Sequence, residues 1–154
     1  MPALVRACSD PLTSRYTSVP SPYTPEDGRL FVGAGRSNTA LPMAIVSAAD
    51  PAEVLGAVGV HAYDAQAARA EIGYWTAPWS RRRGVATRGL TLMSRWALSA
   101  LELDRLELYA EPANVASHGV ATRAGFTRGD LVRGGITLRG RRRDVLRFVL
   151  HAAP

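Results

Sequence analysis

The stretch Arg81-Arg82-Arg83-Gly84-Val85-Ala86-Thr87 decides how this chain folds, because it joins the strand-like run 70–76 to the start of a long helical pattern. Backbone N–H groups at a helix start have no acceptor within the helix, and the helix dipole adds partial positive charge there. Gly84 and Ala86 carry little or no side chain, so a ligand can approach the backbone closely. The three arginines add fork-shaped donors suited to phosphate. The stretch therefore predicts a site for a phosphorylated ligand.

Predicted strands and helices alternate on both sides of this stretch. Apolar residues at steps of three or four predict one long helix after it, and Asn114 and Gly125 are suited to begin and end a second helix. Pro78 ends the preceding strand, because proline cannot donate to a strand ladder. The expected elements are helical turns around 10–16 and after 25–27, strands over 42–48, 54–63, 69–77, 105–110, 126–132 and 144–150, and helices over 84–101 and 115–124, with 134–143 as a hairpin tip or a loop.

This order of elements predicts an α/β domain with a mixed sheet. A chain of 154 residues can bury about two thirds of its unfolded surface, and residues 1–154 are most simply one domain. The runs 54–63 and 69–77 are joined by a short turn and predict an antiparallel pair. The long helix between 69–77 and 105–110 predicts a right-handed crossover between two parallel strands.

Charge and composition narrow the classes of partner. The net charge is +6 and all 19 basic residues are arginine, which indicates a genome-wide compositional bias. Two clusters stand out, at 81–83 and 139–143. A basic balance favours an anionic partner, although a solvated turn is the simpler explanation for 139–143. No apolar run approaches the ~20 residues that span a bilayer, so no membrane partner is expected.

The cysteine and histidine residues argue against a disulfide framework and against a metal site. The single Cys8 cannot form an internal disulfide and, with no signal-peptide pattern in residues 1–25, fits a cytoplasmic protein. The three histidines, His61, His118 and His151, are scattered without ligand spacing, so no metal is expected.

Four motifs in order resemble the GNAT acyltransferases, and more narrowly the RimJ/RimL-like branch that acetylates ribosomal-protein N-termini. The motifs are Ala70-Glu71-Ile72-Gly73-Tyr74-Trp75, Arg81-x-x-Gly84-x-Ala86, Asn114-x-x-Ser117 and Ala124-Gly125-Phe126. Two further segments, Val19-Pro20-x-Pro22-Tyr23-Thr24 and Asp144-Val145-Leu146, are similar to that branch, so the resemblance covers nearly the whole chain.

The resemblance implies a GNAT-type fold: a mixed, largely antiparallel, twisted sheet with a central parallel strand pair that splays apart, flanked by helices. Relatives usually begin with a further strand before the first helix, and nothing like it precedes Ala7-Cys8-Ser9-Asp10-Pro11. The first N-terminal strand is therefore expected to be missing. Residues 3–6 could partly substitute for it, or a partner chain, such as a second copy in a homodimer, could cover the exposed edge.

The resemblance also implies acetyl-CoA as the acetyl donor, a co-substrate rather than a bound cofactor. The family's pyrophosphate loop maps onto Arg81, Arg82, Arg83, Gly84, Val85, Ala86 and Thr87. Tyr74, Trp75 and Thr76 would pair with the pantetheine amides as an added strand. Asn114 would contact the cofactor arm, and its alternative role is that of a plain helix cap.

Acetyl transfer needs a neutral amine, and the resemblance places a catalytic glutamate at Glu71, acting directly or through water. An α-amine with a pKa of ~7.8 is roughly 15% neutral at pH 7, whereas a lysine amine with a pKa of ~10.4 is about 0.04% neutral. A general base therefore matters far more for a lysine acceptor. The alternative for Glu71 is a surface carboxylate paired with an arginine. Glu107 and Glu111 share one face of the strand 105–110 and are the second choices.

The departing thiolate needs a proton or hydrogen-bond donor, and the resemblance assigns this role to Ser117. Many family members use a tyrosine in the helix after the asparagine, but that position is Ala121 here. Ser117 matches the serine of the RimL-like branch, and a simple helix-surface serine is the alternative.

Three functions are compatible with these observations. The leading one is an amine N-acetyltransferase that acts by direct attack in a ternary complex, on a peptide N-terminus or a small-molecule amine. The second is a catalytically weak acetyl-CoA-binding module with a sensing or assembly role. The third, a nucleic-acid binder, is disfavoured because the arginine clusters lack interleaved aromatic residues and no nucleic-acid motif is present.

Overall fold

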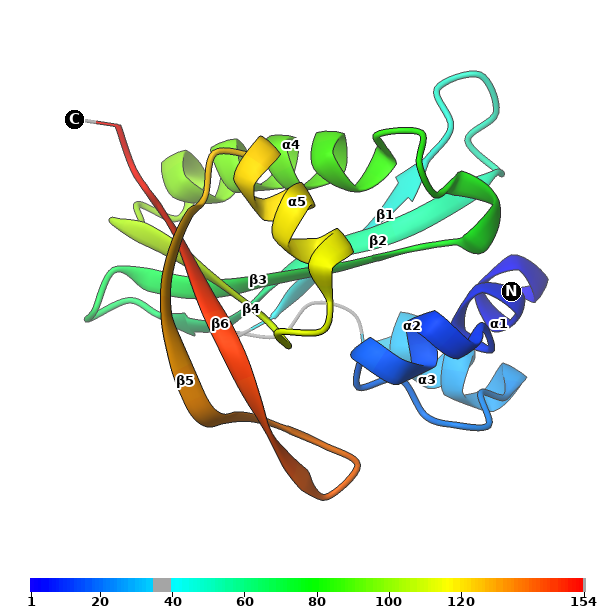
Figure 1. The fold of residues 1–154 in the computed structure, drawn as a ribbon. Coiled ribbons are helices and arrows are strands. Elements are labelled where there is room, and N and C mark those ends of the chain that lie inside the picture. The colour runs from blue at the N-terminus through cyan, green and yellow to red at the C-terminus, as the bar shows by residue number, and fades with distance from the viewer. Residues whose placement is uncertain (35–39, 154) are drawn as a thin grey trace.

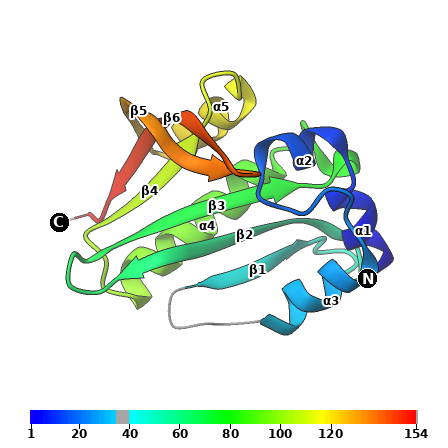
Figure 2. The same ribbon diagram turned by 90° about the horizontal axis from the view of Figure 1, so that it is seen from below.

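A six-stranded sheet with the order β1-β2-β3-β4-β6-β5 forms the centre of the computed structural model, which describes residues 1–34 and 40–153. Helices α4 and α5 cover one face of the sheet, and α1, α2 and α3 lie against the other (Figures 1 and 2). The helices are α1 (Pro2–Cys8), α2 (Pro11–Tyr16), α3 (Pro25–Ala34), the short 3₁₀ helix η1 (Pro78–Ser80), α4 (Val85–Ala100) and α5 (Val115–Arg123). The strands are β1 (Leu41–Val46), β2 (Val54–Asp64), β3 (Arg69–Thr76), β4 (Arg105–Ala110), β5 (Thr127–Leu138) and β6 (Arg141–His151).

The strands β3 and β4 are the parallel pair among the described strands, and every other paired neighbour is antiparallel. Their register covers only Arg69–Glu71 opposite Arg105–Glu107, although both strands continue beyond it. The two strands therefore part at their carboxyl ends. This arrangement confirms the mixed sheet that the order of elements predicts and the splayed parallel pair that the family resemblance implies.

The core lies between α4 and the sheet. Leu90, Met93 and Ala97 on one stripe of α4 are buried against Ile72 of β3 and Leu106 of β4. The stripe follows the spacing of three and four residues that predicted the helix. Because α4 crosses from the end of β3 to the start of β4, its packing fixes both strands beneath one helix.

The hairpin of β5 and β6 is longer than predicted. The segment 134–143 was expected to be a hairpin tip or a loop, but most of it continues the two strands, with Ile136 opposite Arg143 and Leu138 opposite Arg141. The tip itself is Arg139 and Gly140, both with positive φ (50° and 71°). The run of arginines conceals the strand because only cross-strand pairing, and no apolar alternation, marks it in the sequence.

The N-terminal residues form a helix, so the expectation that residues 3–6 partly substitute for a strand is wrong. Pro2 stands in the first turn of α1, where its missing N–H costs nothing, and Ala7 and Cys8 are buried. Within the described residues 1–34 there is no strand, as the sequence predicts. The edge of the sheet on this side is therefore β1.

Candidate active site

A cleft of about 990 Å³ lies where β3 and β4 part. Its walls come from the ends of both strands, from the loop before α4, from the first turns of α5 and from residues 12–19 around α2. The pairing of β3 with β4 stops at Glu71, so the edge of β3 beyond that residue is not covered by β4. Trp75 and Thr76 line the cleft on this edge, where an extended ligand could add to the strand.

The loop between β3 and α4 presents its backbone to the cleft. Helix α4 begins at Val85, so the N–H groups of its first turn have no acceptor within the helix. Arg82 and Gly84 both have positive φ (60° and 73°), which turns the chain sharply before the helix. Such turns gather backbone N–H groups into an anion-binding concavity. The cleft-lining residues of the predicted phosphate stretch are Arg81, Arg82, Gly84, Val85, Ala86 and Thr87.

The guanidinium groups of Arg83 and Arg81 are hydrogen-bonded to other parts of the protein. Arg83 is outside the cleft wall, and its guanidinium donates to the backbone oxygen of Trp79 at 3.5 Å. Arg81 lines the cleft, but its guanidinium is paired with the Asp10 carboxylate and donates to Thr13 Oγ1 at 3.1 Å. Arg81 thus fastens the loop to α2.

The Asp10 carboxylate binds both Thr13 and Arg81, and the sequence did not indicate that one side chain binds both. Asp10 caps α2 by accepting from the Thr13 N–H at 2.9 Å, and it also holds Arg81, which is 71 residues away in the sequence. The hydrogen bond from Arg81 is the main cause that lowers the pKa of Asp10 below its ordinary value, although burial opposes it. The carboxylate therefore stays ionised and links the N-terminal helices to the loop.

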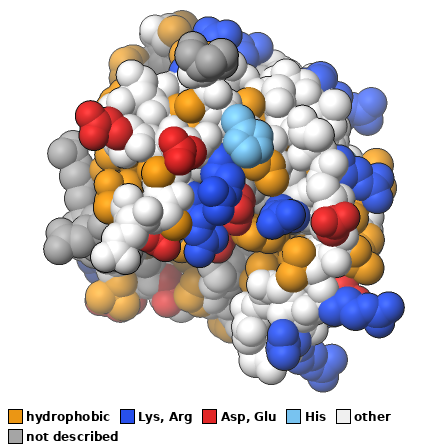
Figure 3. Space-filling model, turned by 90° about the vertical axis from the view of Figure 1, so that its left-hand side faces the viewer, with side chains coloured by type: hydrophobic (Ala, Val, Ile, Leu, Met, Phe, Trp, Pro, Cys, Tyr) orange, Lys and Arg blue, Asp and Glu red, His pale blue; other side chains and the backbone are white. Residues whose placement is uncertain are grey.

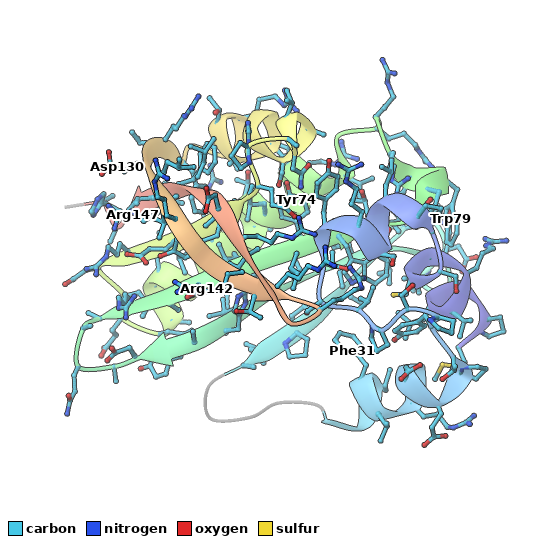
Figure 4. All side chains as sticks on the ribbon, turned by 60° about the horizontal axis from the view of Figure 1, so that its bottom comes forward. Phe31, Tyr74, Trp79, Asp130, Arg142 and Arg147 are labelled. Atoms are coloured by element: carbon cyan, nitrogen blue, oxygen red, sulfur yellow. The ribbon has the colours of Figure 1, made fainter. Side chains whose placement is uncertain are left out.

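Two further side chains hold the loop in place, and sequence reasoning missed both contacts. The Ser80 hydroxyl is fully buried and donates to the Leu55 backbone oxygen at 2.5 Å, and the Trp79 indole donates to the Val54 oxygen at 3.1 Å. The guanidinium of Arg6 lies 4.0 Å from the centre of the Trp79 ring. Figure 4 shows Trp79 at the end of the molecule beside α1, away from Tyr74.

Tyr74 and Ser117 meet across the gap between β3 and α5. The Tyr74 phenol oxygen lies 2.7 Å from Ser117 Oγ, and both residues line the cleft. Burial raises the pKa of Tyr74 to about 12, although the Ser117 hydrogen bond and the Arg123 charge act against it, so the phenol keeps its proton. Tyr74 was predicted to act through its strand backbone. The only sequence signal for its hydroxyl is that a tyrosine on the apolar face of a strand needs a polar partner.

Asn114 has the capping role that the sequence allowed. Its side-chain oxygen accepts from the Ser117 N–H at 3.3 Å, which places Ser117 in the first turn of α5. Asn114 also lines the cleft, so capping and contact with a ligand are compatible.

Glu71 lies beside the cleft and next to a histidine. Its carboxylate is about one third exposed, and Oε2 is 3.4 Å from His61 Nε2 on the adjacent strand β2. His61 lines the cleft, whereas Glu71 does not. Sequence reasoning treated His61 as structural, because the antiparallel register that brings His61 opposite Glu71 is not visible in either residue alone.

The other two carboxylates of the site differ from each other. Glu107 is buried and accepts from Arg105 at 3.0 Å and from the Tyr109 hydroxyl at 2.8 Å, with Arg69 at 3.4 Å. Burial would raise its pKa, but these hydrogen bonds and charges outweigh it and lower the pKa below the ordinary value. Glu107 is therefore a structural anion and a poor proton acceptor. Glu111 lines the cleft at the end of β4.

The described residues contain neither a metal-ligand cluster nor a membrane-spanning helix. Among residues 1–34 and 40–153, no three His, Cys, Asp or Glu side chains are grouped so that they could hold a metal ion. No helix in the described part of the chain has the length and apolar character needed to cross a membrane.

A mixed sheet whose parallel strands part beside the start of a helix is the arrangement of the N-acetyltransferase fold. Residues 1–127 match the family model described as "Acetyltransferase (GNAT) domain", and the chain belongs to this family.

Similar proteins and structures agree with this membership. YdaF of Bacillus subtilis (strain 168), whose name assigns it provisionally as a ribosomal N-acetyltransferase, is 30% identical over 95 residues, covering 62% of this chain and 52% of YdaF. The N-acetyltransferase YoaA of the same organism, itself uncharacterized, is 32% identical over 84 residues, covering 54% and 48%. The chain thus spans about half the length of the curated relatives it matches.

Two solved structures share the fold. A Vibrio cholerae protein, titled provisionally as a ribosomal-protein-serine acetyltransferase, has a TM-score of 0.86 at 22% identity and covers 98% of this chain and 87% of its own. RimL, titled as a ribosomal L7/L12 alpha-N-protein acetyltransferase in complex with coenzyme A, has a TM-score of 0.80 at 23% identity and covers 96% and 84%. At these identities, both matches show that the chain shares the overall fold of the two structures.

Proposed function

We propose that this chain transfers an acetyl group from acetyl-CoA to a primary amine, either a protein N-terminus or a small-molecule amine. The observation that carries the proposal is the cleft between β3 and β4, which reaches both the amide-lined start of α4 and the Tyr74–Ser117 pair. One end suits a diphosphate, and the other offers hydroxyl groups to a departing sulfur atom.

The residues present fit the donor. Backbone N–H groups of residues 84–87 would hold the diphosphate, and the free edge of β3 at Trp75 and Thr76 would pair with the pantetheine amides. Asn114 would contact the arm of the donor from the other side of the cleft. Acetyl-CoA supplies the thioester, whose sulfur is displaced in the reaction.

The transfer exchanges one bond for another. The amine nitrogen forms a bond to the acetyl carbon, the carbon–sulfur bond breaks, and its electron pair leaves with the sulfur. The Ser117 hydroxyl donates a hydrogen bond to this sulfur as it takes up negative charge, and Tyr74, whose pKa is raised to about 12 so that it keeps its proton, donates a hydrogen bond to Ser117 Oγ. The thiolate takes up a proton from solvent after it departs. The tyrosine that the helix lacks at Ala121 is thereby replaced by one from β3.

The proton lost by the amine passes to the His61–Glu71 pair. His61 lines the cleft, and Glu71 lies behind it at 3.4 Å, so Glu71 acts through His61 or through water. Glu111 is the second choice because it also lines the cleft, and Glu107 is disfavoured because its carboxylate is already held by Arg105, Arg69 and Tyr109.

Thiol release tests the proposal. The purified chain is incubated with acetyl-CoA and a panel of short peptides with free N-termini, polyamines and other amines, and both free thiol and acetylated product are measured. We expect release of thiol in step with product for at least one acceptor. Binding of acetyl-CoA by calorimetry with no product from any acceptor would instead support the acetyl-CoA-binding module.

A further inference from the structure

The positive charge of this chain is concentrated in the β5–β6 hairpin. Residues 127–151 contain seven arginines and two aspartates, whereas the rest of the chain contains twelve arginines and eleven acidic residues. The hairpin thus carries nearly all of the net charge of +6. Figure 3 shows arginine side chains spread over this side of the molecule, several of them at its right and lower edges.

The end of this hairpin is fixed at the mouth of the cleft. Ile136 of β5 lines the cleft. At the tip, the Arg139 guanidinium donates to the backbone oxygen of Ser14, to Ser14 Oγ at 3.0 Å and to the Val19 oxygen at 3.3 Å. The segment 16–19 lines the cleft as well. The hairpin and the residues after α2 therefore form one rim.

Arg141 and Arg143 lie on the cleft side of the hairpin. Side chains of residues directly opposite in an antiparallel pair share a face, and Arg143 is opposite Ile136, while Arg141 is opposite Leu138. Ile136 lines the cleft and Leu138 is 8% exposed, so this face of the hairpin is the one turned toward the cleft. Both arginines are exposed, and none of the ion pairs within the described residues involves either of them.

We propose that Arg141 and Arg143 bind acidic side chains of a peptide acceptor whose N-terminus enters the cleft. The inference rests on the proposed function and names its substrate class: N-termini followed within several residues by Asp or Glu. Guanidinium groups pair with carboxylates through two parallel hydrogen bonds. A nucleic acid fits this surface less well, because Phe148, the only Phe, Tyr or Trp in residues 127–151, is 1% exposed and cannot stack on a base.

Peptide binding tests the inference separately from catalysis. Peptides with the same first two residues and then six acidic, neutral amide or basic residues carry a fluorophore at the carboxyl end, and their Kd is measured by anisotropy with coenzyme A present. We expect the acidic peptide to bind roughly tenfold more tightly than the neutral one and to lose this advantage in high salt, as two exposed ion pairs predict.

Substitutions of Arg141 and Arg143 test whether these two side chains bind the acidic peptide. Arg141→Glu with Arg143→Glu should abolish the preference for the acidic peptide, the milder Arg141→Gln with Arg143→Gln should reduce it, and Arg95→Glu, an exposed arginine of α4, should leave it unchanged. Thermal melting confirms that each variant is folded. Equal Kd values for all peptides, or tight binding of a single-stranded oligonucleotide that displaces the acidic peptide, would overturn the inference. Absence of thiol release would overturn only the proposed function, because the binding measurement does not depend on turnover.

Discussion

Tyr74 and Ser117 are separated by 43 residues in sequence, yet their hydroxyl oxygens lie 2.7 Å apart at the centre of the candidate site. The sequence indicated Ser117 through its place after Asn114, and it indicated Tyr74 only as part of a strand. The contact depends on the divergence of β3 from β4, which opens space for α5 to approach Tyr74. At the scale of the residue, the chemistry therefore comes from pairs that no local pattern contains.

Ser117→Ala is expected to lower kcat about 10- to 100-fold and to leave the Kd for acetyl-CoA nearly unchanged, since a hydrogen bond to a charged group contributes about 1.5–3 kcal/mol. Tyr74→Phe should have a smaller effect of the same kind, and the double variant should be less severe than the two losses added. Steady-state thiol release and calorimetry measure the two quantities. The exposed Ser99→Ala on α4 is the control, and normal turnover of Ser117→Ala would remove the serine from the mechanism.

Glu71→Gln is expected to lower kcat by about 100-fold at pH 7, because general-base catalysis contributes about 10²–10⁴. The Kd for acetyl-CoA should change little, and His61→Gln should give a loss of similar kind if the two residues act together. The pH dependence of kcat from pH 6 to 9 is the measurement, with the exposed Glu53→Gln as the control. Equal activity of Glu71→Gln and the wild type across this range would exclude Glu71 as the base.

At the scale of the element, the loop from η1 to α4 is built as a rigid unit. Ser80 and Trp79 bind it to the start of β2, and Arg81 binds it to the N-cap of α2. A close approach also explains Gly56 of β2, where an added Cβ would lie 2.3 Å from the Trp75 oxygen. The loop thus keeps its backbone amides in place before a ligand arrives, which lowers the entropic cost of binding.

Gly84→Glu is expected to abolish binding of coenzyme A. The residue has a φ of +73°, and a carboxylate there would repel the diphosphate from the helix start. The thermal shift produced by coenzyme A measures the effect. Gly140→Glu is a matched control, because Gly140 has a φ of +71° and open space around it but lies at the tip of the hairpin. A normal shift with Gly84→Glu would place the diphosphate elsewhere.

Asp10→Asn is expected to lower the free energy of unfolding by about 1–2 kcal/mol at pH 7, because it removes the charge paired with Arg81 but keeps a good helix cap. The pKa of Asp10 is lowered in the folded state, so its stabilisation is complete above the ordinary pKa of ~3.9 and is lost as the pH falls through the folded pKa. Denaturant unfolding between pH 7 and pH 3 should therefore show a shallower acid decline for Asp10→Asn than for the wild type. The exposed Asp130→Asn should keep the wild-type decline.

At the scale of the whole molecule, stability depends on the layer between α4 and the sheet. Leu90→Ala is expected to lower the free energy of unfolding by about 2–5 kcal/mol, since Leu90 is 0% exposed and its removal leaves a cavity. Leu92→Ala, on the same helix but 69% exposed, should change it by less than about 0.5 kcal/mol. Equal losses for the two variants, measured in urea, would show that α4 does not pack as described.

Much of the molecule could be predicted from the sequence, and the exceptions have physical causes. The strand–loop–helix unit, the crossover and the Asn114 cap were predicted correctly because local spacing and capping chemistry specify them. The length of the β5–β6 hairpin was missed, since Arg141–Arg143 lack the apolar alternation of a half-buried strand. The helix α1 was missed because its seven residues are too few to show a helical period.

By itself, the sequence determined the class of fold, and it predicted an anion site at the start of the long helix. Both depend on periodicity, on small residues at a turn and on a helix start, which are all properties of neighbouring residues. Only the tertiary structure decided which side chains work together. Asp10 holds Arg81, His61 faces Glu71, Tyr74 reaches Ser117, and Arg139 at the hairpin tip binds Ser14. Each of these pairs depends on strand register or on packing between elements, and the free energy that fixes them comes from burial of the whole core rather than from any segment alone.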